Sequence, residues 1–337
     1  MPKTMTITVY QYDELPTEKA KERAREWFKI SNAELGNVRD KISDDMKETL
    51  SSIGLGDCNP QFSLGYCQGD GASFYGTIDV VDFVHHQRAI LKSIEDRQHY
   101  EVSRYDLYRD VVPDDLKAGD MVYSTYETAS EGKGRVVLSK DSGKIGQRIV
   151  SIAREGQHTY IVRSYGAFDE KHAKKLLDRL NNLSIGPEAL DILDEWRDDE
   201  IWPTIKVLHH GDYYHWNSMY IEMDTDWYGL RHDEVVNQAK AMEPGSEGDK
   251  QCTERLKEIE SHIDRQFDDL RMLFGEFAKS VGKQLENDGY ATREGEESDE
   301  QVSENIRANE YWFTSSGSRS ATVDAEPNDA NEKGTSQ

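Results

Sequence analysis

Two strand-like runs joined by a short glycine-bearing loop constrain the fold of this chain more than any other feature. The segment Phe62–Ile78 is rich in aromatic and β-branched residues, and Gln68-Gly69-Asp70-Gly71 divides it in two. Aromatic and β-branched residues favour strands, and glycine beside aspartate favours a tight reversal. The sequence therefore predicts a hairpin with a carboxylate, an amide and free backbone N–H groups at its tip.

The remaining hydrophobic pattern predicts an α+β protein in which helices cover one face of an antiparallel sheet. The strands of this sheet are expected near 5–12, 60–67, 72–81, 204–209 and 213–223, with 311–314 as a candidate edge strand. The covering helices are expected over 17–31, 37–53 and 253–285, with further helices from about 81 and over 169–182, 187–196 and 298–309. Residues 1–103 and 166–317 form this expected core.

Residues 104–165 differ from the core in charge and in pattern. The segment holds 10 Lys and Arg against 9 Asp and Glu, a net charge of +1, which leaves −25 for the remainder. Short strand-like runs separated by glycine-bearing turns are typical of a small β-barrel of the SH3 type. We expect an inserted SH3-like β-barrel here. We also expect a disordered acidic tail over 318–337, which has almost no large apolar side chains.

The chain as a whole is strongly acidic, with 65 acidic and 41 basic residues and a formal net charge of −24. Phosphate binding needs clustered Lys and Arg, so this charge argues against direct nucleic-acid binding except through the inserted module. A protein partner, above all a basic one, fits the charge. A surface that imitates nucleic acid and simple solubility are the alternatives.

Targeting and cysteine patterns favour the cytoplasm. Met1–Thr4 lead directly into a strand-like run, so no signal peptide is expected, and no apolar run approaches membrane-spanning length. Cys58, Cys67 and Cys252 show neither zinc spacing nor a disulfide framework. We therefore expect a protein of the reducing cytoplasm, without membrane association and without a cofactor.

The loop at the hairpin tip is the first candidate site. Its glycines permit close approach by a ligand or by another segment, and its carboxylate can bind a cation or orient water. A plain turn is the alternative, because a lone Gly-x-Gly is not a dinucleotide-binding motif. Gln68, Asp70 and Ser73 are the candidate binding residues of this hairpin.

A second candidate site lies in His209–His215, where histidines and tyrosines gather ahead of Glu222. Tyr214 and His215 are its candidate binding residues. A metal set of Asp70, His215 and Glu222 is an alternative, although its spacing matches no standard metal site. Half-buried hydrogen-bonding side chains would give the same pattern. The absence of a nucleophile motif and of a phosphate-binding loop favours a protein that is not an enzyme.

Several of these motifs together resemble a family of uncharacterised proteins from tailed phages and prophages. They are Tyr10–Leu15, the Gln-Gly-Asp-Gly-Ala-Ser-Phe hairpin at 68–74, the hairpin residues Tyr213–His215, and the Asn-Glu-Tyr-x-Phe-Thr ending at 309–314. The resemblance covers about 1–100 and 200–317 and does not extend to 104–165. It implies a phage context in the host cytoplasm and brings no established activity.

These observations favour a phage accessory protein that binds a host or phage macromolecule without catalysis, in counter-defence or host takeover. Two alternatives stay open. One is a metal-dependent, nuclease-like hydrolase using Asp70, His215 and Glu222. The other is an acidic mimic of nucleic acid that blocks a DNA-binding enzyme.

Overall fold

The chain divides into two compact units. The computed structural model describes residues 7–35, 37–65, 69–128, 134–140, 147–167, 170–198, 201–211, 213–225, 230–242 and 244–320. The terminal unit takes Met1–Asp44 and Gly289–Gln337 from the two ends of the chain, and the central unit takes Asp45–Asp288.

Both units combine helices with antiparallel strands, which confirms the α+β class. The α-helices of the described residues are α1 Glu18–Leu35, α2 Asn37–Ser52, α3 Val80–Asp96, α4 Glu170–Asn182, α5 Pro187–Asp198, α6 Leu230–Lys240, α7 Glu247–Glu296 and α8 Asp299–Ala308. The strands are β1 Val9–Gln11, β2 Asn59–Ser63, β3 Gly71–Ile78, β4 Gln98–Asp106, β5 Met121–Thr128, β6 Gly134–Lys140, β7 Gln147–Glu155, β8 His158–Ala167, β9 Pro203–His209, β10 Met219–Thr225 and β11 Trp312–Thr314. Two 3₁₀ turns, η1 Tyr12–Glu14 and η2 Trp216–Ser218, complete the order.

The terminal unit has its own small sheet and its own core. β1 and β11 pair antiparallel, with Tyr10 opposite Phe313. Phe313 is fully buried and packs with Phe28 of α1 and Ile306 of α8. The prediction that both end strands join the central sheet, with α1 covering it, is therefore wrong. A strand pattern shows which face is buried and does not show which strand is the partner.

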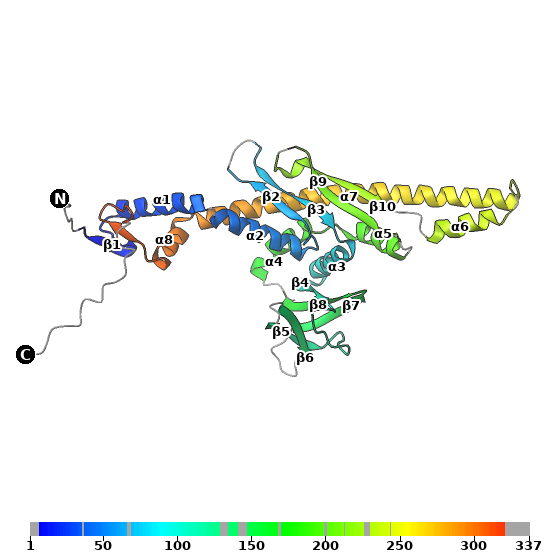
Figure 1. Ribbon diagram of the computed structural model, residues 1–337, viewed down its shortest axis with the longest axis horizontal. Coiled ribbons are helices and arrows are strands. Elements are labelled where there is room, and N and C mark those ends of the chain that lie inside the picture. The colour runs from blue at the N-terminus through cyan, green and yellow to red at the C-terminus, as the bar shows by residue number, and fades with distance from the viewer. Residues whose placement is uncertain are drawn as a thin grey trace, which may run out of the picture. The chain divides into compact units, whose positions relative to one another are not determined.

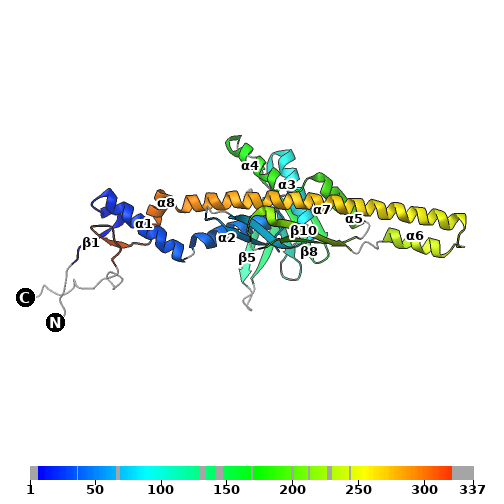
Figure 2. The ribbon, with the colours of Figure 1, turned by 90° about the horizontal axis from the view of Figure 1, so that it is seen from above.

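The central unit is built on a four-stranded antiparallel sheet in the order β10-β9-β3-β2. Along β9 buried and exposed residues alternate, with Ile205 and Val207 buried, as expected for a sheet with one covered face. The long helix α7 runs beside this sheet in both ribbon views (Figures 1 and 2). The helix approaches the sheet closely at Gly282, where a Cβ atom would lie 2.7 Å from Met219 Cε of β10 and 3.4 Å from the carbonyl oxygen of Ala72 of β3.

A five-stranded antiparallel sheet, ordered β4-β8-β7-β5-β6, forms the rest of the central unit's β structure (Figure 1). It has a core of its own, made by Tyr105, Leu116, Val122, Leu138, Ile149 and Ile161. The expected closed SH3-like barrel is not formed by the described strands, because β4 and β6 are open edges. A single bridge from Val111 to Val137 meets the edge of β6 where a closing strand would lie.

The ends of this sheet differ from the predicted module at 104–165. β4 begins at Gln98, and Gln98 lies directly opposite Ala167 at the end of β8. The chain therefore enters and leaves the sheet at neighbouring positions, which is the geometry of an insertion. Of the predicted tail, residues 321–337 lie outside the described residues.

Candidate binding site

A hydrogen bond and a glycine shape the tip of the β2–β3 hairpin. Ser63 and Gly71 are the last partners of its ladder. The Ser63 hydroxyl donates a hydrogen bond to Asp70 Oδ1 at 2.6 Å, and a bond to an ionised acceptor is among the stronger ones. Gly69 has a φ of 96°, which glycine adopts without strain. The tip therefore holds the Asp70 carboxylate beside the end of β2.

The connection from β9 to β10 is shaped by its own side chains. His215 caps the 3₁₀ turn η2, because its Nδ1 accepts a hydrogen bond from the backbone N–H of Asn217 at 3.1 Å. The Ser218 hydroxyl lies within hydrogen-bond distance of the carbonyl oxygens of Tyr213 and His215, at 3.1 and 2.6 Å. These bonds fix the turn that follows Tyr213 and Tyr214, and both tyrosines are exposed.

The two tips lie side by side at one end of the four-stranded sheet. A Cβ atom on Gly71 would lie 2.8 Å from the Cα atom of His215, and one on Gly69 would lie 3.4 Å from the Tyr213 ring. The first distance is too short for any side chain, so only glycine permits this approach. The structure thus brings the two predicted sites, around Asp70 and around His215, to one place.

Aromatic and imidazole rings gather around this junction. His210 stacks on Tyr220 with 4.1 Å between ring centroids, and Tyr75 meets His209 edge-on at 6.3 Å. We call the whole set the tyrosine–histidine end. Its members are Asp70, Tyr75, His209, His210, Tyr213, Tyr214, His215 and Tyr220.

Its tyrosines are unusually exposed for large side chains. Tyr213 is 65% exposed and Tyr214 is 41% exposed, and Tyr75 and Tyr220 are each 38% exposed. An isolated exposed aromatic residue needs no explanation, whereas a group of them on one structural feature marks an interaction site. The tyrosine–histidine end is such a group.

Two polar atoms next to this end lack partners. Gln61 and Ser73 lie directly opposite each other on β2 and β3. Ser73 is fully buried, and both its hydroxyl oxygen and the Oε1 of Gln61 are buried without a hydrogen-bond partner. A buried polar atom without a partner costs about 1–3 kcal/mol, so a site that leaves two together is unusual.

The structure places the other predicted site residues as follows. Gln68 lies outside the described residues. Ser73 is buried beneath the surface and is not an exposed contact residue, while Tyr214 is exposed. Glu222 is exposed on β10 opposite Lys206, and Met219 and Met223 of that strand are buried.

The alternative metal set does not assemble in the described part of the chain. Those residues contain no group of three or more His, Cys, Asp or Glu side chains placed to hold a metal ion. Glu222 pairs with Lys206 along the sheet, while Asp70 and His215 belong to the tips at its end. The set Asp70, His215 and Glu222 is therefore not supported as a metal centre.

A polar cluster that the sequence did not reveal lies where α3 meets the five-stranded sheet. His85 Nε2 lies 2.9 Å from Glu155 Oε1, and the His85 ring stacks on Tyr160 at 4.1 Å. One turn earlier on α3, Asp82 lies 3.8 Å from the Arg104 guanidinium. These side chains come from α3, β4, β7 and β8, so no local pattern could have joined them. The pair His85-His86 within an apolar stripe was the one available signal.

Burial shifts the titration of this cluster. It raises the pKa of Asp82, lowers the pKa of His85, and raises the pKa of Tyr160 to about 12. Shifted pKa values occur both at catalytic sites and in structural ion-pair networks. Here the groups fill the contact between α3 and the sheet, and Tyr160 is almost fully buried. The cluster therefore joins α3 to the five-stranded sheet.

Comparisons place no known protein beside this chain. No protein-family model matches it, and neither the curated proteins nor the solved structures give a match. Among the described residues, every helix is too short or too polar to cross a membrane. We therefore infer the function from the geometry of the tyrosine–histidine end.

Proposed function

We propose that this protein binds another protein through the tyrosine–histidine end and does not catalyse a reaction on it. The observation that carries the proposal is that exposed tyrosines of β3, of β10 and of the β9–β10 connection gather at one end of the sheet, where the tip that carries Asp70 meets the Tyr213 ring. Tyrosine supplies a large contact area at a low cost in side-chain entropy, and it is enriched at the centres of protein interfaces.

The hydrogen bonds at the site support binding over catalysis. In a catalytic triad a carboxylate would orient the imidazole of a histidine. Here Asp70 accepts a hydrogen bond from Ser63, and His215 Nδ1 accepts one from the backbone of Asn217. Both groups serve to shape the tips that present the tyrosines.

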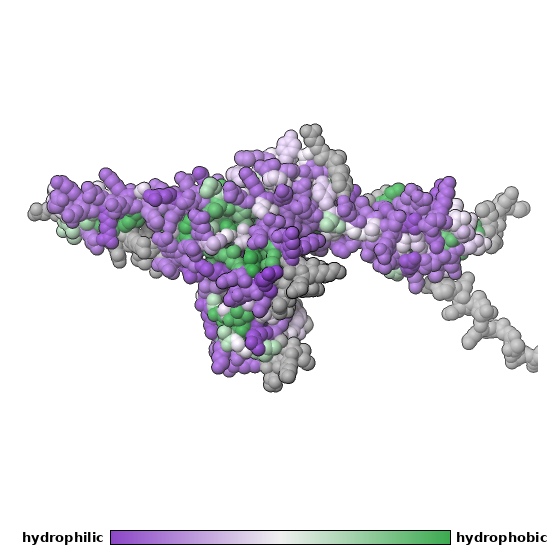
Figure 3. Space-filling view, turned by 180° about the vertical axis from the view of Figure 1, so that it is seen from behind, coloured by the Kyte–Doolittle hydropathy of each residue, from purple (hydrophilic) through white to green (hydrophobic). Residues whose placement is uncertain are grey.

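The acidic character of the chain supports a protein partner. The formal net charge is −24, and hydrophilic residues cover most of the face seen from behind (Figure 3). A high net charge of one sign speeds association with partners of the opposite sign and repels nucleic acid.

We place this binding protein among phage accessory proteins acting in the host cytoplasm. The support is the resemblance to the phage family, whose two hairpin motifs are Gln68–Phe74 and Tyr213–His215. These two motifs contribute four of the eight residues of the tyrosine–histidine end, namely Asp70, Tyr213, Tyr214 and His215. We propose that the five-stranded sheet is an insertion into that family pattern.

Affinity capture from host lysate at moderate salt tests the proposal. The double variant Tyr213→Ala/Tyr214→Ala should lose a saturable partner by about tenfold or more in affinity, because central interface tyrosines contribute more than 1 kcal/mol each. Tyr108→Ala/Tyr126→Ala is the matched control. Tyr108 is 81% exposed and Tyr126 is 71% exposed, so both are more exposed than Tyr213 and Tyr214, and both lie in the region of the five-stranded sheet. Equal capture by both double variants would refute the proposed interface.

A further inference from the structure

The β2–β3 hairpin presents hydrogen-bond acceptors on one face. Gln61 and Ser63 are two residues apart on β2, so their side chains lie on the same face of the sheet. Ser73 is opposite Gln61 and shares that face, and Asp70 is bonded to Ser63. Carboxylate, carboxamide and hydroxyl oxygens thus follow one another along the hairpin towards its tip.

Two of these acceptors lack donors in the described structure. They are the Gln61 Oε1 and the Ser73 hydroxyl, both buried. A donor-rich group arriving at this face would satisfy them after a small rotation of the half-buried Gln61 side chain. The guanidinium of arginine is the side chain best suited to this, because it has five N–H donors and no acceptor.

The Tyr213 ring next to the tip that carries Asp70 suits the same group. A guanidinium is planar, stacks on aromatic faces, and binds a carboxylate through two parallel hydrogen bonds. Tyr213 lies against the tip that carries Asp70. A lysine ammonium would pair with the Asp70 charge, but it lacks the planar group that stacks on a ring and forms two parallel hydrogen bonds.

Building on the proposed function, we infer that the partner's contacting segment is basic and inserts an arginine between Asp70 and the exposed Tyr213 ring. Rotation of the half-buried Gln61 side chain opens the buried Gln61 Oε1 and Ser73 hydroxyl to the remaining donors of the same guanidinium. The net charge of −24 draws such a segment towards the protein. The inference thus names the chemistry of the partner and not only the surface it covers.

A short peptide of alternating arginine and glycine is the probe, with fluorescence anisotropy as the measurement on the full chain. We expect saturable binding, and binding weaker by about tenfold or more for the same peptide with citrulline in place of arginine, because citrulline keeps the shape and removes the charge. Equal binding of the citrulline peptide, equal binding of a lysine peptide, or no binding of the arginine peptide would overturn the inference.

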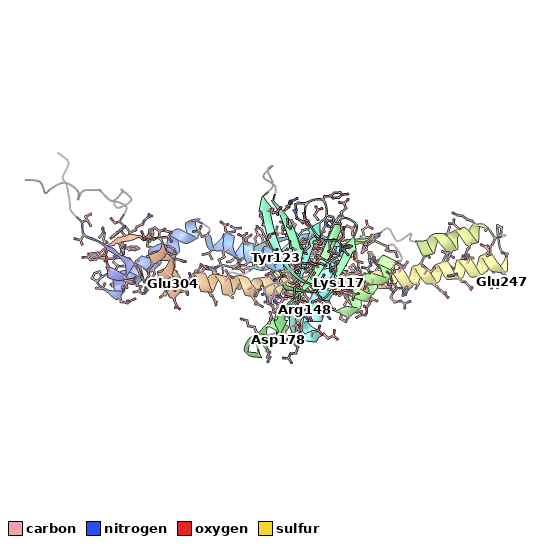
Figure 4. The ribbon with its side chains drawn as sticks, turned by 90° about the horizontal axis from the view of Figure 1, so that it is seen from below. Lys117, Tyr123, Arg148, Asp178, Glu247 and Glu304 are labelled. Atoms are coloured by element: carbon pink, nitrogen blue, oxygen red, sulfur yellow. The ribbon has the colours of Figure 1, made fainter. Side chains whose placement is uncertain are left out.

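Variants locate the binding. Asp70→Asn should weaken the arginine peptide by about tenfold. Asp178→Asn is the matched control, because Asp178 is an exposed carboxylate on α4 and its removal changes the net charge equally (Figure 4). It should change binding by less than about twofold, since an exposed distant charge contributes little. An equal loss in both variants would show attraction by net charge alone and would overturn the inference.

The two proposals fail separately. If capture of the lysate partner depends on Tyr213 and Tyr214 but the arginine peptide binds no better than citrulline, the interface stands and the arginine is wrong. If capture does not depend on these tyrosines, the proposed function is wrong and so is the inference that rests on it.

A competition experiment tests the class of partner. If a single-stranded oligonucleotide displaces the arginine peptide by binding at the same residues, the inference of a basic protein segment is wrong.

Discussion

At the residue scale, the candidate site depends on Gly71 because this residue has no side chain. Gly71 allows the two tips to touch, because a Cβ atom there would lie 2.8 Å from the His215 Cα. That atom is backbone and cannot rotate away. The contact between the tips, and so the shape of the tyrosine–histidine end, requires glycine at this position.

Gly71→Ala should lower the free energy of unfolding of the central unit by about 1–3 kcal/mol, because the two tips must separate to admit the methyl group. It should also weaken partner binding. Chemical denaturation followed by circular dichroism gives the first quantity.

Gly275→Ala provides the contrast at another glycine of the same unit. This glycine lies within α7 and a Cβ there would meet nothing within 4 Å. Alanine should raise stability by up to about 1 kcal/mol, since it is the better helix former. A stabilising effect at both positions would show that Gly71 is not under steric constraint.

The sequence predicted part of this site for chemical reasons. A Gly-Asp-Gly loop between two strand-like runs indicates a hairpin tip with a carboxylate, and Asp70 lies there. The contact between Gly71 and His215 could not be predicted, because it depends on how β3 pairs with β9. The burial of Ser73 was equally hidden, since it depends on neighbours across the sheet.

At the scale of elements, α3 is the central connector of its unit. Its fully buried Gln87 donates from Nε2 to the carbonyl oxygens of Ile53 and Leu183, each at 3.1 Å. Its Oε1 accepts from the backbone N–H of Ile185 at 2.9 Å. One side chain thereby satisfies the backbone beyond the ends of α2 and α4, where helices leave groups without partners.

Gln87→Met should be strongly destabilising, by about 3 kcal/mol or more, because it leaves three buried backbone groups without partners at similar side-chain volume. Urea denaturation measures this. The exposed Gln238 on α6 is the control, and Gln238→Met should change stability by less than about 0.5 kcal/mol. Similar losses for both variants would contradict the connecting role.

The junction of α3 with the five-stranded sheet should respond to pH. His85 faces Glu155 of β7, Tyr160 of β8 and Asp82 of α3, with Arg197 of α5 close to the same glutamate. Burial lowers the pKa of His85 below its ordinary 6.5. The unfolded chain therefore binds the proton first as the pH falls below about 6.5, and the folded state loses stability.

Wild-type protein should consequently lose more stability than His85→Gln between about pH 7.5 and about pH 5.5. Asp82, whose pKa burial raises, acts in the opposite direction and is present in both proteins, so its contribution cancels in the comparison. Thermal unfolding at the two pH values gives the result. A larger loss in the variant would mean that Glu155 stabilises a protonated His85.

Regular apolar spacing explains why most elements were predictable. The apolar stripe of α7 predicts a helix and its buried face, and the alternation in β9 predicts a strand and its buried face. β4 and α6 were not predicted, because β4 carries polar residues on both faces and α6 has few apolar positions. The position of β4 is set by its pairing with β8, and α6 belongs to the central unit.

At the scale of the whole molecule, pairing between distant strands divided the one expected sheet into two, and an open sheet took the place of the expected barrel. β1 and β11 pair with each other in the terminal unit, and the five-stranded sheet stays open where a barrel was expected. Local sequence carries the strand propensity of these segments and not their partners. Charge and turn spacing, by contrast, predicted a separate run of strands at 104–165, and the register of the five-stranded sheet extends it to Gln98 and Ala167.

Excision of residues 98–167, with a short Gly/Ser linker joining Arg97 to Phe168, should leave the rest of the central unit folded. The sheet has its own core, and Gln98 and Ala167 are neighbours, so a short linker can close the gap. The losses include the contacts of His85 with Glu155 and Tyr160, the contacts of Arg104 with Asp79 and Asp82, and the hydrogen bonds of Tyr100 to Ser93 and Asp96. Excision of 104–165 instead leaves Gln98–Ser103 as a strand without β8, and an unpaired strand favours aggregation.

Size-exclusion chromatography and thermal unfolding should therefore show a monodisperse, cooperatively unfolding protein for excision of 98–167 and not for excision of 104–165. Binding through the tyrosine–histidine end should survive in the first. If the first variant is insoluble, the five-stranded sheet is an integral part of the central unit's fold.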